Sequence, residues 1–364
     1  MSGKYIDSFL GANTPKGFVS MYPELLKNEK LKKIYVIKGG AGTGKSSMMK
    51  KIGDISYKNG NFVERIHCSS DPDSLDAVIV EEKGFAILDG TPPHPMEPQY
   101  PGAYETIVNL YPSWDEEKLE ENIEKIKQYV KEYTDCHRKA CAYLSVVASL
   151  LKENRQVAEL CVNRNKIERY ITNITRREFA KAEEENAREE VRFLSAVTPK
   201  GVKLYNLTIE TFCDKVYIID DDIGAVSQQL LKGIRAKAID KKLDIISGYC
   251  VTSPYEKLEH IIIPQLKLGF LTSNRFHKIE VGITEKHIKA SRFTDLKRLN
   301  ERKQYISFNK KASASLLDEA IKAMQNAKKH HDLLEGCYIP CVDFEKVESI
   351  REELITKLKT KKVL

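Results

Sequence analysis

The first third of the chain alternates short apolar runs with glycine-rich or charged segments. A run rich in β-branched residues at 34–38 is separated by GGAGTG from residues 45–57, where Met48, Met49 and Ile52 recur at helical spacing. Further runs of strand length lie at 63–68, 77–80, 85–89 and 105–110. Because strand-like runs alternate with a helical segment, the pattern predicts an α/β domain with a parallel sheet.

From residue 119 the pattern changes to a heptad repeat of apolar or small side chains. Its positions are Leu119, Ile123, Ile126, Val130, Tyr133, His137, Ala140, Leu144, Val147 and Leu151. This spacing predicts a long helix with a coiled-coil-like seam. The polar segment KENRQ interrupts the seam, and a second helical stretch follows to about residue 192. We therefore expect an antiparallel helical hairpin that projects from the domain.

The chain contains an internal repeat. FLGANTPKG at 9–17 and FLSAVTPKG at 193–201 are identical at seven of nine positions, and KKIYVIKGG at 32–40 aligns with DKVYIIDDD at 214–222. Several further segments match in the same order, which chance does not produce. The expected organisation is a sheet domain at 1–114, a helical extension at 115–192, a second sheet domain at 193–310 and a C-terminal helical extension at 311–364.

Composition narrows the class of protein. Of 364 residues, 41% are apolar and 30% are charged, which is typical of a globular chain. Eight cysteines lack any C-x-x-C pair, a usage that favours reduced thiols. No apolar run reaches the length of a membrane span, so we expect a soluble cytoplasmic protein. The net charge of +7 permits a nucleic-acid partner, but no reading motif supports one.

The segment GGAGTGKS at 39–46 matches the phosphate-binding motif G-x-x-x-x-G-K-S/T, with a strand before it and a helix after it. Glycines let backbone N–H groups turn inward around a triphosphate, and the lysine reaches the β- and γ-phosphates. The predicted ATP-binding residues are Gly39, Gly40, Ala41, Gly42, Thr43, Gly44, Lys45, Ser46 and Ser47. Ser46 is expected to bind Mg²⁺. The alternative is a glycine-rich turn with an incidental lysine.

A carboxylate for the magnesium ion is predicted at the end of the run 85–89. Four apolar residues place Asp89 at the C-terminal end of a strand, on the edge where the phosphates are expected. An aspartate at this position is also typical of a simple turn. Gly90 follows, so the glutamate that many ATPases place there to activate water is absent.

Three further residues are candidates for catalysis. Asp71 and Asp73 follow another predicted strand and should lie on the same edge of the sheet. A turn before proline followed by a helix cap explains both aspartates without catalysis, and the two interpretations have similar weight. His94 lies in the proline-rich loop after Asp89, where packing is an equal explanation.

The second copy lacks the phosphate-binding residues. Aligned by sequence, Val226, Ser227 and Gln228 replace Gly44, Lys45 and Ser46, and Thr272 replaces Asp89. Asp221 and Asp222 replace Gly39 and Gly40, and with Asp220 they form an acidic run that should repel a polyphosphate. The second copy is therefore predicted to be a pseudo-domain. Arg275, in the loop that matches that of His94, is one candidate to complete the intact site.

Five segments carry a family resemblance: FLGANTPKGF, KGGAGTGKSSMMKKIG, HCSSDPDSLDAVI, ILDGTPPH and AKKHHDLLEGCYIPCVDFEKV. Together they resemble a family of tandem P-loop ATPases found largely in Firmicutes, and the resemblance covers essentially the whole chain. It implies two tandem P-loop NTPase-like domains with helical extensions and ATP binding, without an established substrate. The family's second loop is commonly an intact GTGKS, whereas this chain has IGAVS.

Two function classes follow from these observations. The first is an ATPase that converts nucleotide state into movement of the helical extensions or of a protein partner bound to them. The second is a small-molecule or nucleoside kinase in which Asp71 or Asp73 accepts the proton of an acceptor hydroxyl. The long helices and the degenerate second copy favour the ATPase.

Overall fold

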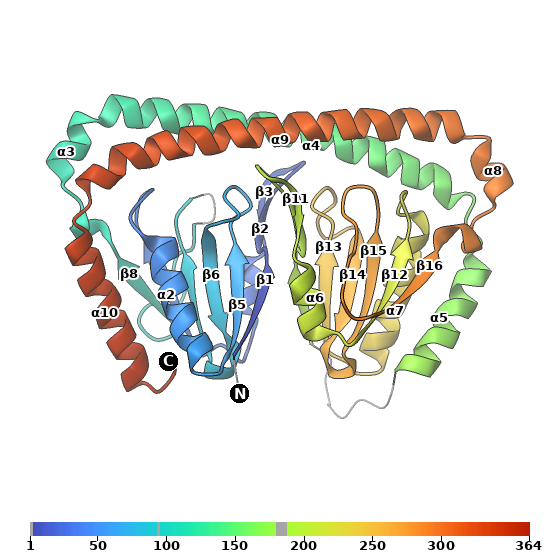
Figure 1. Cartoon of the computed structure of the whole chain (residues 1–364), viewed down its shortest axis with the longest axis horizontal. Coiled ribbons are helices and arrows are strands. Elements are labelled where there is room, and N and C mark those ends of the chain that lie inside the picture. Colours follow the sequence, from blue (N-terminus) through green and yellow to red (C-terminus); the bar gives the residue numbers. More distant parts are fainter. Residues whose placement is uncertain (1–2, 93–94, 180–187) are drawn as a thin grey trace.

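A computed structural model describes residues 3–92, 95–179 and 188–364. The protein has an α/β fold in which two sheet-bearing halves lie side by side beneath two long helices (Figure 1). The first half contains β1 (Lys4–Ser8), β2 (Gly11–Thr14), β3 (Gly17–Ser20), α1 (Tyr22–Leu26), β4 (Lys33–Lys38), α2 (Lys45–Lys58), β5 (Phe62–His67), β6 (Leu75–Val80), β7 (Phe85–Asp89) and β8 (Glu105–Asn109).

The second half repeats this series. It contains β9 (Glu189–Arg192), β10 (Ser195–Thr198), β11 (Gly201–Leu204), α6 (Asn206–Phe212), β12 (Lys215–Asp220), α7 (Ala225–Asp240), β13 (Ile245–Tyr249), β14 (Leu258–Ile263), β15 (Leu268–Ser273) and β16 (Thr284–Lys289). The remaining helices are α3 (Glu116–Glu121), α4 (Ile123–Glu159), α5 (Arg164–Glu178), α8 (Leu296–Asn300), α9 (Lys303–Tyr338) and α10 (Phe344–Thr360).

The two six-stranded sheets have the same strand order. The first runs β1-β5-β6-β7-β4-β8, and the second runs β9-β13-β14-β15-β12-β16. Each sheet is mixed, because β6 and β14 are antiparallel to both of their neighbours while the other pairs are parallel. The prediction of wholly parallel sheets is wrong at this strand. Only residues 68–74 join β5 to β6, and a parallel connection needs about a dozen residues or more.

The halves meet where the two sheet edges approach each other. Phe9, just after β1, and Phe193, just after β9, exchange two backbone hydrogen bonds of 2.9 and 3.0 Å. Both side chains are fully buried, and they share one hydrophobic cluster with Leu144 of α4 and Met324 of α9. One core therefore extends through both halves and the helices above them.

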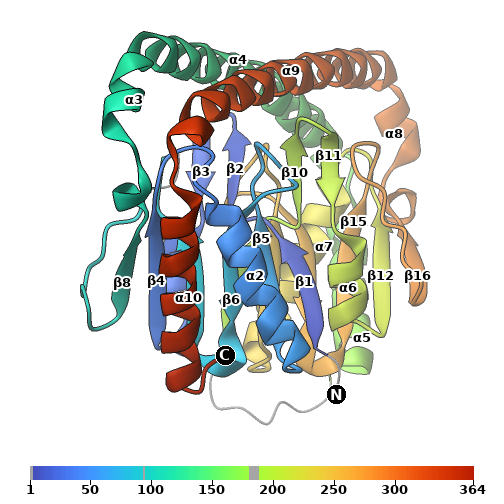
Figure 2. The ribbon, with the colours of Figure 1, turned by 60° about the vertical axis from the view of Figure 1, so that its left-hand side comes forward.

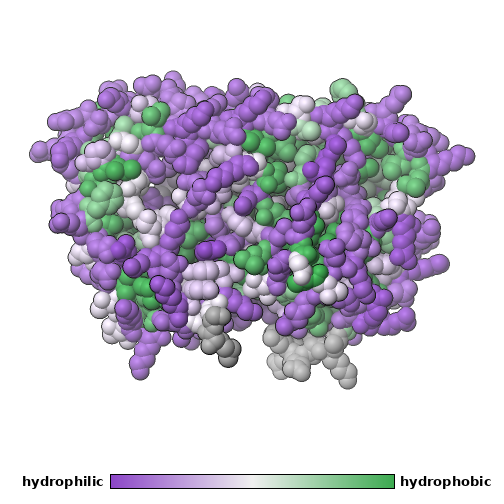
Figure 3. Space-filling view, in the orientation of Figure 1, coloured by the Kyte–Doolittle hydropathy of each residue, from purple (hydrophilic) through white to green (hydrophobic). Residues whose placement is uncertain are grey.

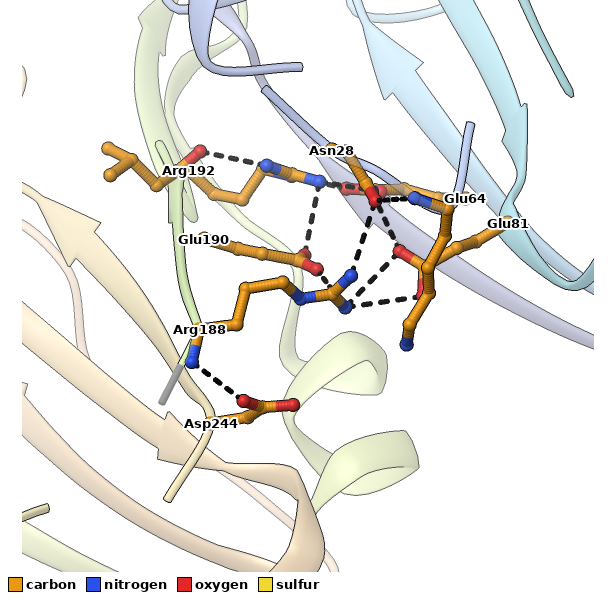
Figure 4. Close-up of polar contacts among 9 residues, drawn as sticks. Asn28, Glu64, Glu81, Arg188, Glu190, Arg192 and Asp244 are labelled. Atoms are coloured by element: carbon orange, nitrogen blue, oxygen red, sulfur yellow. Dashed lines mark hydrogen bonds and ion pairs between the residues drawn. The ribbon is translucent and has the colours of Figure 1, made fainter. Parts of the chain in front are cut away.

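Charged residues extend the same interface (Figure 4). Arg192 is 5% exposed and donates to both carboxylate oxygens of Glu64, at 2.7 and 3.1 Å. Glu190 lies 3.3 Å from the same guanidinium, and Arg188 reaches Glu81 at 3.2 Å. Arginines from the second half thus bind glutamates of the first half. Removing one partner of such a buried pair leaves an uncompensated charge.

The helical extensions differ from the predicted projecting hairpin. α4 continues through KENRQ to Glu159, with Asn154 and Arg155 buried, and it crosses from the first half to the second antiparallel to α9 (Figure 1). α5 then packs against α7 of the second half. α9 crosses back, and α10 packs on the first sheet on the same face as α2 (Figure 2). Each copy therefore covers the other copy's sheet with its last helix.

The surface agrees with the charged composition. On the face shown in Figure 3, hydrophilic residues cover most of the two halves and of the long helices above them. Among the described residues, no helix has both the length and the apolar character required to cross a membrane.

Candidate functional site

The segment GGAGTGKS joins the C-terminal end of β4 to the first residue of α2. Gly44 forms the N-terminal cap of α2 with a φ of 83°, and Gly42 has a φ of 68°. Both φ values lie in the left-handed region, which residues with a Cβ rarely adopt. The Thr43 hydroxyl donates to the Gly40 carbonyl at 2.9 Å and closes the loop on itself. The residue types in the motif are thus required by the shape of this loop.

Lys45 and Asp89 are brought together, as the sequence predicts. β4 and β7 are parallel with Ile37 opposite Asp89, so Asp89 ends its strand beside the loop. The Lys45 ammonium donates to the Gly39 and Gly40 carbonyls at 2.9 and 2.7 Å and lies 3.6 Å from Asp89 Oδ2. The two side chains are only 12% and 14% exposed, so the ion pair is partly shielded from water.

The two predicted magnesium ligands, Asp89 and Ser46, form hydrogen bonds with other residues of the first half. Asp89 Oδ1 accepts hydrogen bonds from the Thr91 backbone N–H at 2.9 Å and from the Thr91 hydroxyl at 2.6 Å. Asp89 therefore also has the turn contacts of the simpler interpretation. Ser46 Oγ accepts the N–H of Leu75, the first residue of β6, at 3.0 Å. Both residues lie on the edge of the sheet where the loop 39–44 begins.

Asp71 makes the contacts of a turn, and Asp73 forms an ion pair with the second copy. Asp71 accepts from the Ser74 hydroxyl at 2.9 Å and lies 3.5 Å from Lys328 of α9. The Asp73 side chain is 73% exposed and pairs with Lys200, in the turn between β10 and β11. The hydrogen bond from Lys200 lowers the pKa of Asp73. A lowered pKa weakens Asp73 as a general base. His94 lies outside the described residues.

A wall of side chains covers the loop, and the sequence did not indicate that the second copy contributes to it. A Cβ built at Gly40 would lie 2.9 Å from Trp114 and 3.1 Å from Tyr338, and one built at Gly42 would lie 2.7 Å from Ile339. Tyr338 ends α9 and Ile339 follows it, so residues of the second copy cover the loop 39–44 of the first. The repeat predicts a C-terminal helical extension, but no signal in the sequence gives its packing partner.

Backbone contacts fix this wall in place. The N–H of Asp115 donates to the Cys341 carbonyl at 2.8 Å, and the N–H of Asp343 donates to the Ser113 carbonyl at 2.7 Å. The Trp114 and Tyr338 rings lie 5.9 Å apart between these bonds. The junction between α9 and α10 is therefore attached directly to the segment that packs on Gly40.

The second copy has the same strand–loop–helix unit with a shorter loop. Gly224 caps α7 with a φ of 84°, as Gly44 caps α2. Four residues, 221–224, replace the six residues 39–44 between strand and helix. The structure therefore corrects the pairing made from sequence: Ala225 stands at the position of Lys45, and Val226 at that of Ser46. Thr272 lies opposite Ile219 as Asp89 lies opposite Ile37, so that replacement is confirmed.

Asp221 accepts four backbone hydrogen bonds in the loop of the second copy. Its Oδ1 accepts the N–H groups of Ile223 and Gly224 at 3.1 and 2.9 Å, and its Oδ2 accepts those of Val226 and Ser227 at 2.9 and 2.8 Å. The residue is 6% exposed. Backbone N–H groups at a helix N-terminus are donors that a phosphate uses elsewhere. A carboxylate of the chain itself occupies them here.

The charged residues beside Asp221 also form ion pairs and hydrogen bonds within the second half. Asp220 pairs with His287 at 2.9 Å, and Asp222 lies 3.6 Å from Lys310. Arg275 donates its backbone N–H to Asp222 at 3.0 Å and its guanidinium to the Lys310 carbonyl at 3.3 Å. These contacts place Arg275 beside the second loop, away from the position predicted for completing the first.

Comparisons of the chain with protein-family models, with curated proteins and with solved structures found no match. The second copy is therefore the available reference for the loop at 39–46. The two loops share strand, helix and capping glycine, and they differ at the residues that would contact a phosphate.

Proposed function

We propose that the first half binds one ATP with Mg²⁺ at Gly39–Ser46, and that the second half is a pseudo-domain that binds no nucleotide. The observation that carries this proposal is the contrast between the two loops. In the second, the Asp221 carboxylate takes four backbone N–H groups. In the first, the longer glycine loop has Lys45 at the helix N-terminus. The resemblance to tandem P-loop ATPases supports the same assignment.

Each residue of the first loop has a defined role in this proposal. The Lys45 ammonium exchanges the Gly39 and Gly40 carbonyls for phosphate oxygens, which are stronger acceptors for a cation. Ser46 and Asp89 supply a hydroxyl and a carboxylate oxygen, the donor type that Mg²⁺ prefers. When bound, the ion neutralises phosphate charge. Ser46 Oγ accepts one N–H, so its second lone pair remains for a ligand.

The wall of side chains over the loop connects nucleotide binding to the long helices. Tyr338 and Ile339 pack on Gly40 and Gly42, so a change in the loop acts directly on the junction of α9 and α10. α9 packs along α4, which ends on the second half. We propose an ATP hydrolase that couples nucleotide state to movement of these helices or of a protein partner bound to them.

The kinase alternative has weaker support. It requires Asp71 or Asp73 as a base, yet Asp71 is held by Ser74 and Asp73 pairs with Lys200. The lowered pKa of Asp73 opposes proton transfer to its carboxylate at neutral pH. The hydrolase proposal leaves the residue that activates water unassigned.

A titration with fluorescently labelled ATP and Mg²⁺ tests the proposal. Lys45→Ala should weaken binding by about 10- to 100-fold, because a hydrogen bond to a charged group contributes about 1.5–3 kcal/mol. Lys50→Ala is the matched control. Lys50 lies on the same helix, and its ammonium binds the Asp73 carbonyl at 2.6 Å. Circular dichroism would confirm that both variants fold. Equal affinity of Lys45→Ala and the unmodified protein would refute the assignment.

A further inference from the structure

Two histidines and a glutamate form a buried cluster in the second half, away from the nucleotide site. Glu259 and His260 belong to β14, and His277 follows β15. One potential ligand atom from each residue lies within 4.8 Å of the other two. The residues are 4%, 1% and 8% exposed. The cluster is distinct from the exposed surface carboxylates found throughout the chain.

His260 lacks the hydrogen bonds that a buried imidazole normally makes. Within the described part of the chain, neither of its ring nitrogens has a hydrogen-bond partner. Buried polar atoms are nearly always satisfied, and each exception requires an explanation. The His277 ring lies 5.2 Å from the His260 ring, and His277 Nε2 contacts the Thr272 carbonyl at 3.1 Å. A ligand that binds one ring nitrogen of His260 would remove part of the cost of its two unpaired nitrogens.

The two copies differ in the residue that lies opposite His260 in the sheet. Gly248 lies opposite His260 in the sheet, and the equivalent pair in the first half is Ile66 opposite Ala77. A Cβ at Gly248 would lie only 3.0 Å from His260 Cβ. The second copy therefore combines a glycine with a histidine where the first combines an isoleucine with an alanine. The loss of one large side chain makes room for the imidazole.

We propose that Glu259, His260 and His277 bind a divalent transition-metal ion such as Zn²⁺. Two imidazoles with one carboxylate are a donor set that such ions accept. Tetrahedral ligands at about 2.0–2.1 Å from the ion lie roughly 3.3 Å apart. The side chains must therefore close by about 1.5 Å at most, which side-chain rotation provides.

The neighbouring cavity offers an ion one open position. Lys257 holds Glu259 Oε1 at 2.7 Å, and Oε2 lies 3.9 Å from His277 Nε2. The lysine charge opposes a cation, and the rest of the cavity is lined by charges of both signs, with Lys152 and Arg155 as well as Asp221 and Asp222. Glu259 and His277 also line this cavity, which has a volume of about 300 Å³. The fourth position would therefore open onto a space of the size that small ligands use.

The experiment titrates Zn²⁺, and separately Co²⁺, into the full-length protein after treatment with EDTA and dialysis. The decisive variant is Gly248→Ile with His260→Ala, which recreates the Ile66 and Ala77 pair of the first half. It should bind Zn²⁺ at least about 10- to 100-fold more weakly than the unmodified protein, because loss of a residue that only supports a metal ligand already costs that much. Bound Co²⁺ should give the visible absorption of a four- or five-coordinate site.

His331→Asn is the matched control. His331, Asp332 and Glu335 also lie close together, but on the surface of α9, with Asp332 paired to Lys328. This control should keep the high-affinity site. If the double variant does not fold, as judged by circular dichroism, His277→Gln provides the same test. Equal Zn²⁺ affinity of the unmodified protein and of a folded cluster variant, or loss of binding in the control, would overturn the proposal.

Discussion

Asp221→Ala tests whether a carboxylate of the chain replaces a bound anion in the second copy. In the structure, four backbone N–H groups around the start of α7 donate to this carboxylate at 2.8–3.1 Å. The substitution removes all four acceptor contacts and the negative charge at a helix N-terminus. It leaves the capping glycine Gly224 and the loop length unchanged. The expected effect is therefore specific to the missing anion.

The loss of stability expected for Asp221→Ala follows from the burial of its four backbone donors and from the cavity beside them. Loss of an aspartate cap costs about 1 kcal/mol, and a buried donor left unpaired costs about 1–3 kcal/mol. Asp221 lines the cavity of about 300 Å³, so water can reach some of the four donors. We expect the free energy of unfolding to fall by about 2–4 kcal/mol. Asp222→Ala is the control, since its side chain is 53% exposed and its nearest cation is 3.6 Å away.

The assay is urea unfolding with and without inorganic phosphate. Phosphate should stabilise Asp221→Ala by binding the vacated N–H groups. With a Kd of about 1 mM, about 20 mM phosphate restores roughly 1.8 kcal/mol. The unmodified protein and Asp222→Ala should respond less. Unchanged stability of Asp221→Ala, or an equal phosphate response in all three proteins, would refute the reasoning.

Three further changes probe other parts of the molecule. Asp89→Asn should weaken ATP binding more with Mg²⁺ than without it; equal losses in labelled-ATP titrations would make Asp89 a turn residue only. Arg192→Ala should lower the free energy of unfolding by about 3–5 kcal/mol, because Glu64 stays buried without its cation; an unchanged urea midpoint would contradict this. Burial lowers the pKa of His137 to about 4, so the unfolded state takes up the proton first as pH falls, and stability is lost from about pH 6.5 to 4. His137→Gln should remove up to about 3 kcal/mol of this loss in urea unfolding, and an identical pH profile would contradict it.

Local patterns in the sequence predicted several elements, but the helical stretch expected to about residue 192 is wrong at its end, where α5 ends at Glu178 and Glu189–Arg192 form β9. The run 34–38 lies within β4, the run 85–89 is β7, and Met48, Met49 and Ile52 are buried as their helical spacing indicates. The repeat predicted two sheet-bearing halves, and the common strand order agrees with it. These features depend on residues that are close in sequence, where apolar periodicity is informative.

Features that depend on distant residues were not predicted. The heptad seam of α4 indicates a helix with a partner, but period alone does not distinguish a returning helix from α9, which begins at Lys303. The role of Asp221 depends on a loop two residues shorter than the first, and the sequence alignment placed the capping glycine incorrectly. The acidic run suggested repulsion of a ligand, whereas the structure shows one of its members, Asp221, held by four backbone N–H groups of the loop itself. Tyr338 and Ile339 likewise lie over the loop because α9 and α10 of the second copy pack on the first half.

The number of nucleotides bound per chain tests the central claim most directly. Isothermal titration calorimetry of the full-length protein with ATP and Mg²⁺ should give a stoichiometry near one, and Lys45→Ala should bind ATP about 10- to 100-fold more weakly in the same titration. Asp221→Ala should leave the stoichiometry of ATP unchanged, since Ala225 stands where a phosphate-binding lysine is needed. A stoichiometry of two, or an unchanged ATP affinity of Lys45→Ala, would contradict the account of one intact loop and one closed by its own carboxylate.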